Sequence, residues 1–78
     1  MSVAYLEKID PEKNLRRFYS VRVEPTLFGQ WAAIKSWGRI GGQGQSQEAW
    51  FDDVQSAKSQ TLAWQALKER KGYFQKSQ

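Results

Sequence analysis

The chain contains no cysteine and no histidine among its 78 residues. Without cysteine it can form neither a disulfide nor a thiolate zinc site. Without histidine it lacks the commonest metal ligand and the commonest general base. No nucleophile lies beside a base in any recognisable pattern, which excludes a small hydrolase. We therefore expect a protein that is not an enzyme and that uses no metal, no cofactor and no small-molecule substrate.

Long apolar segments are absent as well. No run of residues reaches the length that a membrane-spanning helix needs, and there is no cleavable signal pattern. The lack of cysteine also agrees with a reducing compartment. We expect a cytoplasmic protein with no membrane partner.

Aromatic residues and positive charge are what the chain does have. Four Trp, four Phe and three Tyr can each bury about 150–250 Å², which helps a short chain to build a core. The length predicts a single domain over residues 1–78. The net charge of +4 suits an anionic partner, although an ordinary basic surface explains it equally well.

The residue pattern predicts strands first and one helix afterwards. Runs of β-formers or alternating residues mark strands at residues 3–9, 17–23, 30–37 and 45–51. In the second run Tyr19, Val21 and Val23 fall on one face. Short connections favour antiparallel pairing of consecutive strands. The predicted fold class is α+β, with an antiparallel sheet of four or five strands and one helix packed on one face.

The helix is predicted over about residues 54–71. Asp52 or Asp53 suits its N-cap, and Gly72 its C-terminal stop. The stripe that should face the sheet consists of Val54, Ala57, Thr61 and Trp64. Lys68 lies on the same stripe, where a charge is not expected, so its stem must extend past Trp64 or its ammonium must reach a carbonyl or a carboxylate. The residues after Gly72 favour one more short strand.

A glycine-rich motif follows the third predicted strand. It reads SWGRIGGQGQ over residues 36–45, with Trp37 and Arg39 on either side of Gly38. We predict that Trp37 ends the strand and that Gly38 allows a sharp turn. A nucleotide-binding P-loop is excluded, because the motif has no lysine and is not followed by a helix.

Several ordered blocks of the chain resemble the WGR domain, a family named for its Trp-Gly-Arg signature. The blocks, which together span roughly residues 3–74, are Asn14 with Arg17-Phe18-Tyr19, Leu27-Phe28-Gly29-Gln30-Trp31, Trp37-Gly38-Arg39-Ile40-Gly41 with Gly44-Gln45, and Lys68 with Lys71-Gly72-Tyr73. In poly(ADP-ribose) polymerases this domain binds DNA at strand breaks, and bacterial relatives occur alone or fused to other modules. We expect no catalytic domain alongside it. The resemblance implies a small binding module that recognises nucleic acid, specifically DNA ends or nicks, through phosphate contacts and aromatic stacking.

The resemblance and the charge pattern together give a set of candidate nucleic-acid-binding residues. They are Asn14, Arg16, Arg17, Trp37, Gly38, Arg39, Lys71 and Tyr73. Stacking of a base on an aromatic ring contributes about 1–3 kcal/mol, and an Arg fork can clamp a phosphate.

Each candidate also has a purely structural interpretation. Trp37 can belong to the core, Arg39 can pair with a carboxylate, Asn14 can form a turn and Tyr73 can pack on the sheet. Arg16 and Arg17 can belong to an ordinary solvated face. The other tryptophans, Trp31, Trp50 and Trp64, are assigned to structure.

A protein–protein interaction module that uses the Trp37 and Arg39 surface is the competing function, because both residue types are common at interfaces. The arrangement of charge separates the two. If the cations converge around Trp37, nucleic acid is favoured. If they scatter around an exposed apolar patch, a protein partner is favoured.

Overall fold

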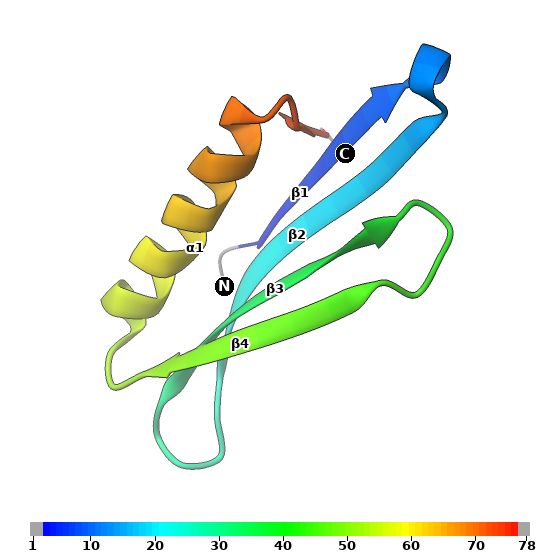
Figure 1. Ribbon diagram of the computed structural model, residues 1–78. Coiled ribbons are helices and arrows are strands. Elements are labelled where there is room, and N and C mark those ends of the chain that lie inside the picture. The colour runs from blue at the N-terminus through cyan, green and yellow to red at the C-terminus, as the bar shows by residue number, and fades with distance from the viewer. Residues whose placement is uncertain (1–2, 77–78) are drawn as a thin grey trace.

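A computed structural model describes residues 3–76 of the chain. Its elements are β1 (Val3–Asp10), the 3₁₀ turn η1 (Pro11–Lys13), β2 (Leu15–Pro25), β3 (Trp31–Arg39), β4 (Gln45–Phe51), α1 (Val54–Arg70) and β5 (Phe74–Gln75). The strands form one five-stranded antiparallel sheet in the order β4-β3-β2-β1-β5. Helix α1 crosses one face of this sheet (Figure 1). The predicted α+β class is confirmed, and the tail after the helix supplies the fifth strand.

The core lies between α1 and the sheet face that the alternation of β2 predicts. Tyr19 and Val21 form one buried cluster with Leu6 of β1. A second cluster joins Val23 to buried residues of β3 and α1. Trp64 packs against both clusters and is partly buried, so its predicted position on the stripe that faces the sheet is confirmed.

Both ends of α1 are capped by the residues that follow from local chemistry. The Asp53 carboxylate accepts a hydrogen bond of 2.8 Å from the Ser56 amide, which satisfies one free donor of the first turn. At the other end Gly72 adopts φ +96°, and the Tyr73 amide donates to the Lys68 carbonyl. These are features of a Schellman C-cap. The cap turns the chain back to the sheet, where β5 pairs with β1.

The prediction that Trp37 ends a strand and that Gly38 turns the chain is wrong. Strand β3 continues through Gly38 to Arg39, and the turn falls later, where Gly41 has φ +89°. A Cβ atom on Gly38 would lie 2.6 Å from the Gly44 Cα, a distance that real side chains do not tolerate. Glycine is therefore required here by close backbone approach and not by a bend.

The second sheet face is covered by no helix of residues 3–76, and this determines how exposed one tryptophan is. Trp50 lies on this open face and is 46% exposed, so it is an accessible aromatic of the surface and not part of the core. Trp31 packs against the second buried cluster, as expected of a structural residue. Within residues 3–76 no helix is both long and apolar enough to cross a membrane. The same residues contain no group of acidic side chains arranged to hold a metal ion.

Candidate nucleic-acid interface

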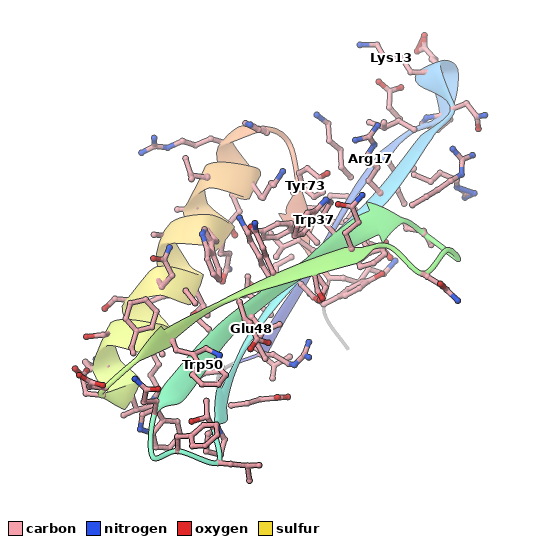
Figure 2. All side chains as sticks on the ribbon, turned by 60° about the horizontal axis from the view of Figure 1, so that its bottom comes forward. Lys13, Arg17, Trp37, Glu48, Trp50 and Tyr73 are labelled. Carbon is pink, nitrogen blue, oxygen red and sulfur yellow. The ribbon has the colours of Figure 1, made fainter. Side chains whose placement is uncertain are left out.

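A hollow of about 630 Å³ opens where β2 begins and β3 ends. Its lining residues are Lys13, Asn14, Leu15, Arg16, Arg17, Trp37, Gly38, Arg39, Lys68 and Tyr73. Figure 2 shows Arg17, Trp37 and Tyr73 together here, with Lys13 towards the tip. The structure thus brings together all the predicted binding residues except Lys71, although they come from both ends of the sequence.

A row of cations crosses the sheet beside this hollow. Lys8 of β1 is the direct pairing partner of Arg17 on β2, which in turn is the partner of Arg39 on β3. Like charges directly opposite one another destabilise a sheet unless something neutralises them. In the part of the chain that the structure describes, no ion pair involves any of the three. The row can therefore hold an anion from outside the chain.

Lys68 adds a further cation from the helix side. Its Nζ lies 5.1 Å from the ring centroid of Tyr19 and 5.3 Å from that of Tyr73. Partial burial lowers the pKa of the Lys68 ammonium, and the charges of Lys71, Lys35, Arg17 and Lys8 lower it further. An anion bound in the hollow would relieve both effects, since it offsets the burial cost and the repulsion.

Trp37 lies in the next row of the sheet, opposite Tyr19. It packs against the first buried cluster, and the Lys35 Nζ lies 5.6 Å from its ring centroid. It is nevertheless half-buried and lines the hollow. Trp37 is thus both a boundary of the core and an accessible aromatic surface next to the cation row.

The structural alternatives for the other candidates are resolved one by one. Asn14 has a left-handed backbone (φ 52°) and its amide donates to the Pro11 carbonyl at 3.2 Å, so it does form the turn. Tyr73 packs edge-to-face on Tyr19 at 6.2 Å. Both residues still line the hollow. Arg39, in contrast, has no carboxylate partner among the described residues.

Lys71 lies outside the lining, and its recorded contact is made by its backbone. Its carbonyl accepts a hydrogen bond of 2.6 Å from the Lys8 Nζ. Lys68, which does line the hollow, was not among the predicted binding residues. The sequence indicated it, because a charge is unexpected on the apolar stripe of the helix. Lys8 and Lys35 could have been found from strand alternation, because each lies two residues from a helix-facing apolar side chain.

The chemistry of the hollow follows from its lining. The lining supplies cationic donors, an amide, a phenol and an indole, and no acidic side chain of the described residues contributes to it. Such a surface can bind phosphate oxygens and stack on an exposed ring.

Comparison with known proteins identifies the family. The model of the WGR domain matches residues 2–78. A relative, "Uncharacterized protein y4dW" from Sinorhizobium fredii (strain NBRC 101917 / NGR234), is 36% identical over 69 residues, which is 88% of this chain. The match spans 34% of that longer protein. No solved structure matches the chain significantly. The chain belongs to the WGR domain family.

Proposed function

We propose that this protein is a non-enzymatic module that binds DNA at ends or nicks through the hollow around Trp37. WGR domains of poly(ADP-ribose) polymerases bind nucleic acid, which sets the class of ligand. The observation that carries the proposal is the cation row of Lys8, Arg17 and Arg39, which lies beside an accessible indole and forms no ion pair with a carboxylate of residues 3–76. Phosphate contacts of this kind are nearly blind to base sequence.

The preference for ends follows from the geometry of stacking. Trp37 can stack only on a base pair or sugar whose face is exposed, and a continuous duplex exposes none. The cations next to it can at the same time hold the phosphates that flank the break. A nick or an end therefore offers both contacts, whereas an intact duplex offers only the phosphates.

Protein docking at the same surface is less well supported. The cations Lys13, Arg16, Arg17 and Arg39 line the hollow together with Trp37. The most exposed large apolar side chains, Leu27 and Phe28, belong instead to the β2–β3 loop, at the other end of the sheet (Figure 1). Charge thus converges where the binding residues were predicted, and the exposed loop residues lie elsewhere.

A competition experiment tests the proposal. The parent protein, Trp37→Ala and the matched control Trp50→Ala are titrated with a short nicked duplex against a closed circle of the same composition. We expect the parent and Trp50→Ala to prefer the nicked duplex. Trp37→Ala should lose that preference, by about tenfold for one lost stacking contact of 1–3 kcal/mol, and keep the salt-dependent background.

Melting curves of the three proteins accompany the titration. Because Trp37 is only half-buried, its variant should still unfold cooperatively. If the parent does not distinguish the two DNAs, end recognition is wrong. If Trp37→Ala is unfolded, Trp37 is a core residue, and the titration is then repeated with Arg39→Gln, whose exposed side chain is not needed for folding.

A further inference from the structure

A second surface lies at the opposite end of the sheet from the cation row. We name it the distal patch and define it by Leu27, Phe28, Ile34 and Trp50. These residues help to line a groove of about 270 Å³ between the β2–β3 loop and the open sheet face. Along β4, Trp50 is five residues from Gln45, the partner of Trp37, which is roughly 17 Å of strand. Figure 2 shows Trp50 and Glu48 well away from Trp37 and Tyr73.

The patch exposes apolar side chains that the fold could have hidden. Leu27 is 98% exposed and Phe28 is 78% exposed, while Ile34 forms a buried floor at 6%. Phe28 lies with its ring centroid 6.1 Å from that of Trp50. Contiguous exposed apolar residues around a groove are typical of an interaction site.

The loop that carries Leu27 and Phe28 is held in place by its own hydrogen bonds. The Thr26 hydroxyl accepts from the amides of Phe28 and Gln30, at 3.2 and 3.1 Å. The Thr26 amide donates to the Gln30 carbonyl at 2.8 Å. The exposed pair is therefore pre-ordered, which lowers the entropy that a partner must remove on binding.

The charge beside the patch is negative. The Glu48 carboxylate accepts a hydrogen bond of 2.7 Å from the Trp50 indole, and no cation pairs with it in the part of the chain that the structure describes. Glu24 also lines the groove, although Arg22 neutralises it at 2.8 Å. A nucleic acid is disfavoured here, because the Glu48 charge repels phosphates. A cationic partner is favoured.

Strand β4 provides an unpaired edge next to the patch. It is the terminal strand of the sheet, and its seven residues, QSQEAWF, contain neither Lys nor Pro, the residues that usually block edge-to-edge pairing. An extended peptide can add to such an edge through backbone hydrogen bonds. A second copy of this chain pairing about the middle of β4 would set Glu48 against its own equivalent, which disfavours self-association.

We propose that the distal patch and the β4 edge bind an extended segment of another protein, in which Lys or Arg lies two residues from a large apolar side chain. Glu48 and Trp50 are two residues apart and point to the same face. A strand added beside β4 places its own side chains opposite them with the same spacing. The basic side chain then meets Glu48, and the apolar one meets Trp50 and Phe28. This site is separate from the proposed DNA site.

A displayed library of short random peptides is the probe. It is selected on the parent protein and counter-selected on the double variant Leu27→Ser/Phe28→Ser. We expect enriched peptides to carry Lys or Arg two positions from Leu, Phe or Trp. A synthetic peptide of the enriched sequence should bind the double variant at least about tenfold more weakly than the parent. Leu62→Ser, which removes an exposed leucine of α1, is the matched control and should bind like the parent.

Two further measurements complete the test. Glu48→Lys should reverse the charge preference of the selected peptides. Backbone amides of β4 should gain protection from hydrogen exchange when peptide binds, which a purely side-chain contact would not produce. Trp37→Ala should bind the peptide like the parent, so failure of the DNA proposal and failure of this one are distinguishable.

Several results would overturn the inference. They are equal enrichment on the parent and the double variant, enriched peptides without a basic residue, and unchanged β4 protection. Self-association that disappears in the Leu27→Ser/Phe28→Ser variant would make a second copy the occupant instead. Because Leu27 is almost fully exposed, the single variant Leu27→Ser repeats the test if the double variant does not fold.

Discussion

At the scale of single residues, Lys68 shows that a side chain suited to the proposed binding site can lower the stability of the domain. The helix stripe around it is apolar, yet its ammonium is held among two tyrosine rings and four other cations. Contacts with the rings favour the charged form, but burial and repulsion outweigh them and lower its pKa. The charge therefore costs stability in the free protein, and an anion bound at the proposed site would offset this cost.

The sign of the resulting pH dependence can be worked out. The folded-state pKa of Lys68 lies below the ordinary value of 10.5. Charged Lys68 therefore lowers stability at neutral pH, and this cost disappears as the pH rises through the folded-state pKa towards 10.5. The Lys68→Met variant lacks the titration. We expect the stability of the parent relative to Lys68→Met to increase between neutral pH and pH 10.5.

Urea unfolding of both proteins across this pH range measures the difference. All other titratable groups are common to both proteins, so their contributions cancel to first order. A relative stability that stays constant with pH would mean that Lys68 is as well solvated in the folded state as in the unfolded one.

At the same scale, Gly38 shows that a sequence pattern does not reveal why a position requires glycine. Gly38 was interpreted as a bend because Gly favours turns, but its role depends on Gly44 six residues later. Only the pairing of β3 and β4 reveals that the two backbones approach so closely. Gly41, in contrast, adopts φ +89° in the turn itself, where local turn chemistry is enough to favour glycine.

At the scale of elements, the sequence predicted what local periodicity controls. The bounds of β4 agree with the pattern, and α1 ends one residue earlier than predicted. Strands β2 and β3 run longer than predicted, because pairing extends them past residues that alone favour turns. The exposure of Trp50 could not be predicted, because alternation shows that it lies on one face but not whether another layer covers that face.

The candidate site was predictable only in part for a related reason. Family resemblance gave the residues on β2 and β3, and the structure confirms that they lie together. Lys8 joins them only through the pairing register of β1 with β2, which no single strand specifies. Charge clusters formed across strands are visible once the register is known.

Contact between α1 and the sheet depends on one large side chain. Trp64 packs against both buried clusters, and the Lys35 Nζ lies 4.8 Å from its ring centroid. We expect Trp64→Ala to lower the free energy of unfolding by about 3 kcal/mol, the lower end for large-to-small core changes because Trp64 is only partly buried. Urea unfolding of this variant and of Leu62→Ala measures the effect.

Leu62 is the control because it lies on the same helix and is 64% exposed, so its loss should change stability by less than about 0.5 kcal/mol. A domain of this length has a total stability of only about 4–12 kcal/mol, so Trp64→Ala should be visibly weakened. Equal stability of the two variants would contradict the packing role of Trp64.

At the scale of the whole molecule, the proposed DNA site and the distal patch lie towards opposite ends of the longest axis. The described chain measures 46 × 23 × 21 Å, with the turn η1 and the β2–β3 loop at opposite ends of the sheet (Figure 1). The cation row and Lys68 lie towards η1. Glu48 and Asp52 lie towards the loop, where Gln30 donates to the Asp52 carboxylate at 3.1 Å. The Glu48 charge repels phosphates at the distal patch, whereas the cation row attracts them at the proposed DNA site.

The salt dependence of DNA binding should therefore change only when a cation of the proposed DNA site is removed. Each cation that touches a phosphate releases condensed counterions, so log K falls with log[salt] in proportion to the number of contacts. Arg17→Gln and Arg39→Gln should each lower the slope by about one unit for every duplex sequence alike. Arg22→Gln, the matched control, should leave the slope unchanged, since Arg22 lies on the open face and already pairs with Glu24 at 2.8 Å.

Binding isotherms of the parent and the three variants on one nicked duplex, at several NaCl concentrations, give the slopes. If Arg22→Gln lowers the slope as much as the other two, the phosphates follow the open face of the sheet, and the hollow around Trp37 is not where DNA binds.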